Sequence, residues 1–276
     1  MRSISKISIV TPCHNAQRFI EETVVSVLNQ AAVRAGRVEL EYLIVDGAST
    51  DATAEIVESL RAPQISVISE PDTGMYDALA KGLSRASGDV IAYINAGDYY
   101  HPYAFDAVID IFEAPNISWL TGYSTIYNEK GVVTKVSAPF VYRRRLLKCG
   151  AYGTYLPHVQ LESTFWRREL LESVDMKTLA RLKLAGDAYL WNCFSRAAEL
   201  HIAETQLGGF RKHRGQLSEN ADAYQAEASS FARAPTLVDR MIAHHDRVLW
   251  QAPTRVKKLM NAKHFLCYDH LSGNWK

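Results

Sequence analysis

The stretch from Glu70 to Asp98 constrains the fold of this chain more than any other part of the sequence. Met75, Leu79 and Leu83 recur every four residues, which predicts a helix with one buried face. Residues 90–94 then form an almost continuous apolar run, which is typical of a strand buried on both faces of a parallel sheet. Beyond this run lies a carboxylate, Asp98. Because open α/β sheets bind ligands outside the carboxyl ends of their strands, Asp98 is the first candidate for chemistry.

The same alternation of strand and helix begins near the N-terminus. Strands are predicted over residues 7–10, 42–45 and 65–68, with helices between them. Asn15 follows the first strand and is expected to cap the next helix, which reaches about Gln30. We therefore expect an α/β fold built on a mainly parallel sheet flanked by helices.

The composition indicates a folded globular protein. The chain has 276 residues, of which 47% are hydrophobic, so it can bury a sizeable core. A formal net charge of +1 offers no general attraction to nucleic acid. The four cysteines follow no metal-binding or disulfide spacing, and no apolar run approaches the roughly 20 residues that span a bilayer. The expected location is the cytoplasm.

Two of the first four strands bring an acid to the same edge of the sheet. Asp46 follows the second strand and Asp98 follows the fourth. Acids in this position suit a nucleotide, because one can bind the base or ribose while another holds a divalent cation against a diphosphate. Neither G-x-G-x-x-G after the first strand nor G-x-x-x-x-G-K-[ST] occurs, so two common nucleotide-binding folds lose support.

The second half of the sequence is less regular. A helix is predicted over residues 103–112, and a pair of strands over 119–127 and 132–136. Asp187 precedes another helix, and residues 207–218 form a basic, glycine-rich loop. The remaining residues are predicted to form helices, interrupted at two prolines, Pro235 and Pro253.

Taken together, these segments resemble the inverting family-2 glycosyltransferases, which have the GT-A fold. The resemblance is carried by ISIVTPCHNAQRFIEETVVSVLNQ, EYLIVDGASTDATAEIV, SEPDTGMYDALAKGLSRASGDVIAYINAGD, ESTFWRRELLE and AGDAYLW, in this order, over roughly residues 4–218. It implies a glycosyltransferase domain over residues 1–218, with a nucleotide-sugar-binding half (1–100) and an acceptor-binding half (101–218). A helical C-terminal extension (219–276) is expected to follow.

The resemblance also implies roles for individual residues. The expected donor contacts to the nucleotide and its sugar are Thr11, Pro12, Asn15, Asp46, Asp72 and Lys81. The metal-binding motif falls on Asn95–Asp98, where Gly97 replaces the first of the two acids found in the commoner form. Asp98 is the expected ligand of Mn²⁺ or Mg²⁺. The basic loop is expected to add Arg211, His213 and Arg214 near the phosphates, with His213 a further candidate metal ligand.

The implied reaction moves a sugar from a nucleotide diphosphate, expected to be a UDP-sugar, to an acceptor hydroxyl with inversion. A divalent cation at Asp98 would neutralise the charge that grows on the departing diphosphate. Asp187 matches the family's catalytic base, and base catalysis of this kind contributes about 10² to 10⁴ in rate. Gln160 and Glu162 are expected on the acceptor side. The expected product is a surface polysaccharide or a lipid-linked glycan.

Other interpretations of these residues stay open. Asp187 could cap the helix that follows it, Asp46 could serve only a turn, and Lys81 could be a solvated charge. A nucleotidyltransferase that makes sugar nucleotides has a related sheet, and a protein that only binds nucleotide sugars would also accommodate Gly97. The basic tail could be a solvated face or could dock on the inner face of an anionic membrane; its cations are Arg255, Lys257, Lys258 and Lys263.

Overall fold

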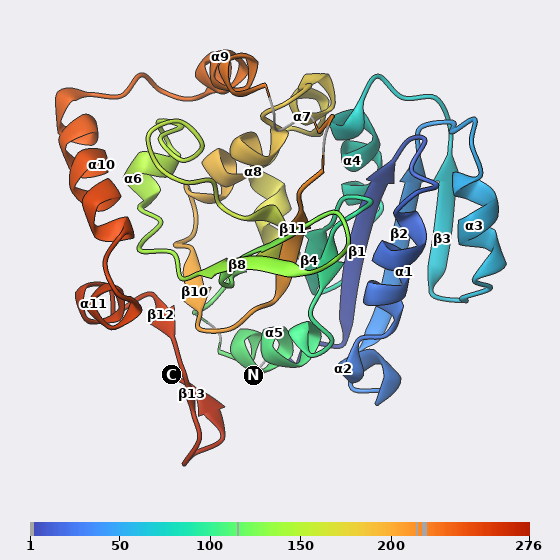
Figure 1. The fold of residues 1–276 in the computed structure, drawn as a ribbon, viewed down its shortest axis with the longest axis horizontal. Helices are drawn as coiled ribbons and strands as arrows, with labels where there is room; N and C mark the ends of the chain where they lie inside the picture. The colour runs from blue at the N-terminus through green and yellow to red at the C-terminus, as the bar shows by residue number, and fades with distance from the viewer. Residues whose placement is uncertain (1–2, 115, 214, 217–219) are drawn as a thin grey trace.

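The computed structural model describes residues 3–114, 116–213, 215–216 and 220–276. Within these residues, eight strands form a central sheet in the order β12-β10-β6-β9-β4-β1-β2-β3 (Figure 1). The strands are β1 (Lys6–Cys13), β2 (Glu39–Asp46), β3 (Ile65–Ser69), β4 (Val90–Tyr93), β6 (Trp119–Thr121), β9 (Thr164–Arg167), β10 (His201–Ala203) and β12 (Phe265–Leu266). Neighbouring strands are parallel except where β9 pairs with β4 and β6.

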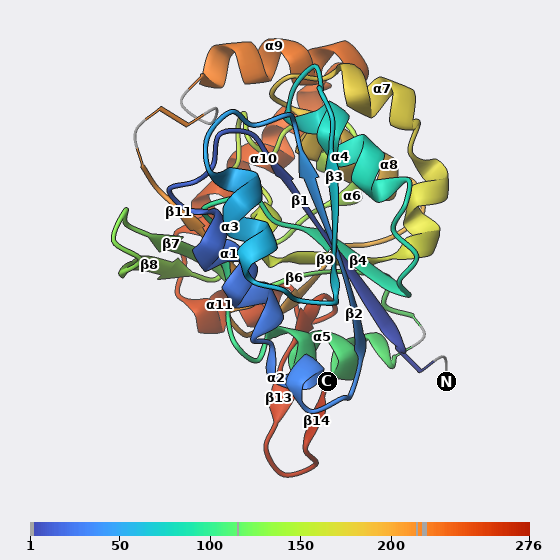
Figure 2. The same ribbon diagram turned by 90° about the vertical axis from the view of Figure 1, so that its right-hand side faces the viewer.

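Helices cover both faces of this sheet (Figure 2). One face packs against α1 (Ile20–Leu28), α2 (Ala31–Arg34), α3 (Thr53–Ser59) and α5 (Ala104–Phe112). The other packs against α4 (Met75–Leu83), α6 (Arg144–Leu147), α7 (Met176–Arg181) and α8 (Gly186–Phe194). Successive side chains of β4 enter the two cores in turn: Ala92 faces the first and Tyr93 the second. Two buried faces explain why this strand is apolar without alternation.

A smaller sheet contributes to the region beyond the carboxyl end of β4. Its strands, in the order β5-β11-β7-β8, are β5 (Tyr99–Tyr100), β11 (Gly208–Arg211), β7 (Ser124–Tyr127) and β8 (Val133–Ser137). The single strand predicted over residues 119–127 is therefore two strands in different sheets. Gly208 lets β11 pass very close to the 3-10 turn η1 (Leu161–Ser163), because a Cβ there would lie 2.0 Å from the carbonyl oxygen of Glu162.

The last part of the chain packs onto this α/β body. It contains α9 (Ala221–Phe231), α10 (Leu237–Trp250) and α11 (Thr254–Met260), followed by β12 and a hairpin of β13 (Tyr268–Asp269) and β14 (Asn274–Trp275). Because β12 pairs with β10, this part extends the central sheet. The division at residue 218 stays a prediction. In the described part of the chain, no helix has the length and apolar character needed to cross a bilayer.

The strands and helices predicted for the first hundred residues are confirmed, apart from one helix start. The first helix begins at Ile20 and has Phe19 as its N-cap, so the prediction that Asn15 caps it is wrong. Asn15 instead has a φ of 50° and belongs to a loop. In the second half, sequence patterns missed β9, which leads directly into the 3-10 helix η2 (Arg168–Ser173).

Candidate active site

The loops that follow β1 and β2 are tied together beside the ends of these strands. The side-chain oxygen of Asn15 accepts a 2.9 Å hydrogen bond from the backbone N–H of Thr50, and its own N–H donates to Ser49. Thr11 and Pro12 are buried beneath the loop, and the hydroxyl of Thr11 lies 3.0 Å from that of Tyr42. Three of the expected donor residues, Thr11, Pro12 and Asn15, thus lie together in the floor of the region beside the strand ends.

Asp46 and Asp72 lie side by side next to this floor. Asp46 is buried and accepts hydrogen bonds from the N–H of Ser49 at 3.1 Å and the hydroxyl of Ser69 at 2.8 Å. Asp72 packs so tightly over Gly47 that a Cβ there would lie 2.3 Å from its Oδ2. Burial, together with the charges of the surrounding acids, raises the pKa of the Cys13 thiol to about 12. The acids therefore surround a neutral thiol.

Lys81 fastens the loop that leads into α4. Its Nζ donates to the carbonyl of Pro71 at 3.0 Å and pairs with Glu70 at 3.1 Å. A loop so held keeps Asp72 in position, so Lys81 has a structural task whether or not it also contacts the donor.

The turn after β4 explains the missing acid at position 97. Gly97 has a φ of 117°, a backbone conformation that strains any residue with a Cβ. Its N–H donates to the hydroxyl of Thr23 at 2.8 Å, and this hydroxyl donates in turn to the carbonyl of Asp98 at 2.9 Å. The backbone of this turn therefore favours glycine and is anchored to α1.

Asp98 and Glu162 form a buried pair of carboxyl groups. Asp98 is 3% exposed and its Oδ1 accepts the backbone N–H of Arg211 at 2.8 Å. Burial, followed by the neighbouring charge of Glu162, holds the pKa of Asp98 well above its usual range. Burial also raises the pKa of Glu162 to about 7. Each group therefore disfavours the charged form of the other, and a cation bound between them would relieve that repulsion.

The oxygen atoms of this turn suit a hard divalent cation. Besides the two carboxyls, the side-chain oxygen of Asn95 is buried without a hydrogen-bond partner among the described residues. No cluster of three or more His, Cys, Asp or Glu residues that could hold a metal occurs in the described part of the chain. A site with so few protein ligands fits Mg²⁺ or Mn²⁺, which commonly take the remaining ligands from water and substrate phosphates.

The basic loop does not present Arg211 as expected. Its guanidinium is buried between the rings of Phe19 and Tyr99, at 4.5 and 4.4 Å, and pairs with Glu22 at 2.5 Å. Arg211 instead reaches Asp98 through its backbone N–H. The ring centroid of His213 lies 5.1 Å from that of Phe19, the same ring that Arg211 contacts. Arg214 lies outside the described residues.

Asp187 lies in the first turn of α8 and is not its cap. The N-cap is Ala185, and no side chain caps this helix. Oδ1 of Asp187 accepts hydrogen bonds from the N–H of Ala188 at 2.8 Å and the hydroxyls of Tyr224 and Tyr76, at 3.1 and 3.5 Å. Burial raises the pKa of Asp187, while the charge of His158 and the hydrogen bond from Tyr224 oppose that rise. The capping interpretation is therefore wrong.

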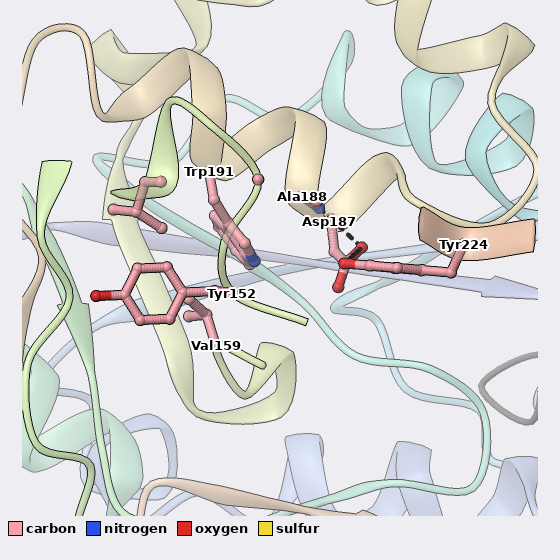
Figure 3. A pocket seen from close by; sticks show the side chains of 8 residues that line it. Tyr152, Val159, Asp187, Ala188, Trp191 and Tyr224 are labelled. Atoms are coloured by element: carbon pink, nitrogen blue, oxygen red, sulfur yellow. Dashed lines mark hydrogen bonds between the residues drawn. The ribbon is translucent and has the colours of Figure 1, made fainter. Parts of the chain in front are cut away.

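A small hollow opens beside Asp187 (Figure 3). Its volume is about 10 Å³, which is about the size of one water molecule. Asp187 and Tyr224 lie on one side, with the indole of Trp191 across from them (Figure 3). The space beside the carboxylate therefore admits a hydroxyl group.

Glu162 connects the two ends of the site. It shares a hydrogen bond with Asp98, and the charge of Asp187 raises its pKa further. Gln160, expected beside it, instead clamps β7, because its amide exchanges hydrogen bonds of 2.7 and 2.6 Å with the backbone of Thr125. Glu162 thus interacts with both Asp98 and Asp187, and the cleft shared by the two aspartates stays a prediction.

A comparison with known protein families decides what kind of enzyme holds these carboxyls. Residues 8–173, more than half of the chain, match the family described as glycosyl transferase family 2. The chain belongs to glycosyl transferase family 2. Family membership supports the interpretation as a glycosyltransferase over that as a nucleotidyltransferase. Asp187 lies beyond the matched residues.

Curated relatives of this family-2 glycosyltransferase are distant. An uncharacterized glycosyltransferase of Nostoc sp. (strain PCC 7120) is 24% identical over 217 residues, covering 75% of this chain and 65% of that protein. The Escherichia coli enzyme WfgD, a UDP-Glc:alpha-D-GlcNAc-diphosphoundecaprenol beta-1,3-glucosyltransferase, is 29% identical over 147 residues, covering 52% of this chain and 56% of that enzyme. The chain thus spans less than two thirds of each relative's length.

Solved structures show the same fold. TarS of Staphylococcus aureus in complex with UDP-GlcNAc aligns with a TM-score of 0.59 at 18% identity, over 94% of this chain and 71% of that chain. The mannosyltransferase PcManGT of Pyrobaculum calidifontis, in complex with GDP-Man and Mn²⁺, aligns with a TM-score of 0.57 at 18% identity, over 94% and 73%. The glycosyltransferase therefore has the GT-A fold.

Sequence reasoning missed the aromatic surroundings of Asp187. Tyr76 lies on α4 and Tyr224 on α9, and both hydroxyls converge on this carboxylate. A tyrosine in a helix gives no signal of such a partner. Tyr224 also belongs to the part of the chain after Ser218, where no motif was recognised.

Proposed function

We propose that this glycosyltransferase moves a sugar from a nucleoside-diphosphate sugar, a UDP-sugar in the first instance, to the hydroxyl of a glycan or lipid-linked acceptor, with inversion and with Mn²⁺ or Mg²⁺. One observation carries this proposal. Three carboxyls with raised pKa values, those of Asp98, Glu162 and Asp187, lie together beyond the sheet, and a hydroxyl-sized hollow adjoins the third.

The residues at the proposed donor side of the site suit the binding of a nucleotide. The floor formed by the loop after β1 and the adjacent acids Asp46 and Asp72 lies beside the strand ends, where ligands of α/β sheets bind. Similar structures hold UDP-GlcNAc in TarS and GDP-Man in PcManGT. The proposed donor residues are Thr11, Pro12, Asn15, Asp46, Asp72 and Lys81.

Asp98, with Glu162 and Asn95 beside it, would hold the cation. Mn²⁺ or Mg²⁺ bound there supplies positive charge where a diphosphate leaving group becomes negative. The backbone N–H of Arg211 fixes the Asp98 carboxyl from β11, so the ligand oxygens are oriented before metal arrives. His213 and Arg214 are kept as proposed contacts on this side.

Asp187 would take the proton of the acceptor hydroxyl. Its Oδ1 is occupied by hydrogen bonds from Ala188 and Tyr224, so Oδ2 is the oxygen that receives the proton. The raised pKa makes the carboxylate a stronger base than an exposed aspartate. The small hollow also limits the water that could compete with the acceptor.

The acceptor class is proposed from the family relatives. WfgD is named for a diphosphoundecaprenol-linked acceptor. A second hollow, a groove of about 200 Å³ between the loop at Cys149–Tyr155 and α9, could receive further sugar units, because Gly150 borders both hollows. Polysaccharide or lipid-linked glycan synthesis is the proposed role.

A screen of nucleotide release tests the proposal. The purified chain is incubated with UDP-, GDP- and dTDP-sugars, with Mn²⁺ or with a chelator, and free nucleoside diphosphate is measured. We expect slow metal-dependent hydrolysis of one donor class, abolished in Asp98→Asn. Release without metal, or no release and no binding with any donor, would contradict the proposal and favour another use of the fold.

A further inference from the structure

The outer face of α10 carries large apolar side chains that face solvent. Leu237 is 74% exposed, Met241 64% and Val248 62%. At about 100° per residue, these three fall within an arc of about 40° on the helix. With the exposed His244 on the same line between Met241 and Val248, they form a mainly apolar stripe on the outward side of the helix. A stripe of this kind marks a binding surface.

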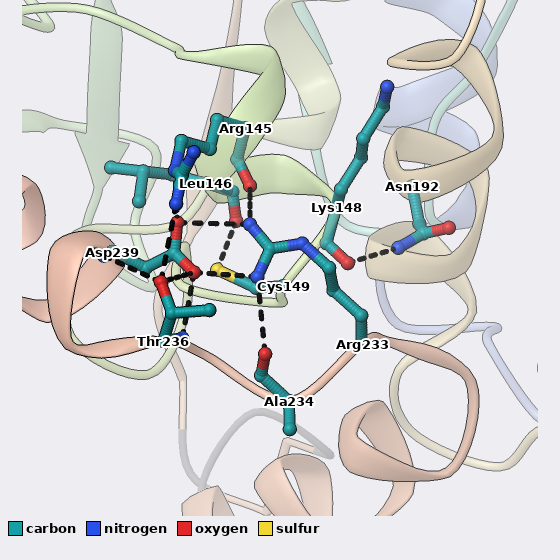
Figure 4. A network of polar contacts seen from close by, with 9 residues as sticks. All are labelled: Arg145, Leu146, Lys148, Cys149, Asn192, Arg233, Ala234, Thr236 and Asp239. Atoms are coloured by element: carbon teal, nitrogen blue, oxygen red, sulfur yellow. Dashed lines mark hydrogen bonds and ion pairs between the residues drawn. The ribbon is translucent and has the colours of Figure 1, made fainter.

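Positive charge flanks this stripe and exposed negative charge is absent from the helix. Arg240 and Arg247 are exposed beside the apolar residues. The two carboxylates of α10, Asp239 and Asp246, are 1% and 0% exposed. Both turn inward to arginines of the α/β body: Asp246 pairs with Arg143 at 2.7 Å, and Figure 4 shows Asp239 held by Arg145, Arg233 and Thr236. Pairing these acids internally leaves the outer face of α10 without an exposed carboxylate.

Helix α11 continues the same kind of surface. Leu259 is 83% exposed, and Arg255, Val256 and Met260 are exposed with it. Both helices lie at the edge of the molecule opposite β3 (Figure 1). The positive charge of this surface does not come from the lysines of the tail. Lys257 is buried and donates to the carbonyl of Ala138. Lys258 pairs with Glu204, and Lys263 pairs with Glu199.

We propose that the outer faces of α10 and α11 dock on the surface of an anionic lipid bilayer. A stripe of Leu, Met and Val with flanking arginines is the pattern of a helix that lies in a membrane interface. Anionic lipid complements the arginines, because no carboxylate of residues 237–260 is exposed to repel it. A symmetric contact between two copies of the chain would place the same arginines against each other, which disfavours that occupant.

The docking surface adjoins the proposed acceptor groove. Arg233, Ala234 and Pro235, directly before α10, line the groove that shares Gly150 with the hollow at Asp187. A glycan anchored in the bilayer by a lipid could thus reach the base from the side on which the protein docks. This last step rests on the proposed function, whereas docking itself does not.

Vesicle cosedimentation of the full chain tests the docking. We expect binding to phosphatidylcholine vesicles that contain phosphatidylglycerol, and much weaker binding to phosphatidylcholine alone or at high salt. Replacing Arg240, Arg247 and Arg255 with Glu should lower the apparent affinity by about a hundredfold or more, since each arginine near an anionic surface contributes about fivefold. Replacing Leu237, Met241 and Leu259 with Ser should also weaken binding.

A matched triple variant separates the effect of charge on the docking surface from the effect of the net charge of the protein. Replacing Arg34, Arg85 and Arg181, which are exposed elsewhere, with Glu changes the net charge equally and should leave vesicle binding nearly intact. Equal loss in both triple variants, or no preference for anionic vesicles, would overturn the proposal. So would a stable dimer that the serine variant dissociates. Thermal stabilisation by UDP with Mn²⁺, measured on the same variants, reports separately on the donor site.

Discussion

Tyr224 donates its phenolic hydroxyl to Oδ1 of Asp187 over 3.1 Å. Neither residue lies in the part of the chain that matches the family, residues 8–173. The hydrogen bond joins α9 to α8, so the helices that follow the basic loop complete the site of the proposed base. Removing this contact should therefore alter the chemistry of Asp187 without disturbing the donor end.

Tyr224→Phe should shift the pH profile of transfer. The hydrogen bond favours the charged form of Asp187 and lowers its pKa, so its loss should raise that pKa further. Because the base must be deprotonated, the acidic limb of the kcat/KM profile should move to higher pH. Tyr103→Phe, at an exposed position, is the control. An unmoved acidic limb would show that Tyr224 does not tune the base.

Asp187→Asn should abolish most transfer while leaving donor binding intact. An amide of the same shape keeps the hollow but cannot accept the proton, so kcat should fall by about 10² to 10⁴. Calorimetric titration with UDP and Mn²⁺ should give a Kd close to that of the unmodified chain. Transfer within a few fold of normal would rule out Asp187 as the base.

Gly97→Asp should not create a better metal site. The φ of 117° at this position strains any residue with a Cβ, at a cost of about 1–3 kcal/mol in the free energy of unfolding. Gly97→Ala is the matched control, because its Cβ would meet Phe19 at 3.7 Å, an ordinary contact. Both variants should lose similar stability in denaturant titration. Tighter Mn²⁺ binding by the aspartate variant would show that the turn can adapt.

Asp239→Asn should destabilise the protein at neutral pH and not at low pH. Arg233, with Thr236 and Arg145, holds the pKa of Asp239 well below its usual range (Figure 4). A depressed pKa adds stability above the unfolded value of about 3.9, which is lost as pH falls through the folded pKa. We expect a loss of about 1–3 kcal/mol at neutral pH. Asp222→Asn, exposed in α9, should change little, and a pH-independent difference would refute the charge explanation.

The parts of the site that the sequence predicts are those encoded in local patterns. Asp98 follows an apolar strand and Asp187 opens a helix, and both local placements are confirmed. Their approach to one another depends on η1 and β11, where Gly208 passes against Glu162, and no local pattern reports such a contact. Arg211 shows the same limit, because its charge is visible in the sequence while its burial between Phe19 and Tyr99 is not.

The exposure of the basic residues in the tail is hidden from the sequence for the same reason. Lys257 and Arg255 carry the same charge and lie two residues apart. The helix nevertheless turns the side chain of Lys257 into the core and that of Arg255 outward. The burial of the acids is equally important for the surface charge. If Asp239 and Asp246 were exposed, they would cancel the positive charge of the arginines on α10. Only packing against the α/β body decides which charges remain on the surface.

Binding of UDP with Mn²⁺ to the unmodified chain and to Asp98→Asn tests the account most directly. At a ligand concentration about 100 times Kd, the unmodified chain should gain roughly 2.7 kcal/mol in the free energy of unfolding. Asp98→Asn should fold normally and lose the part of this gain that requires metal. Equal metal-dependent stabilisation of both proteins, or none in either with any nucleoside diphosphate, would contradict the account.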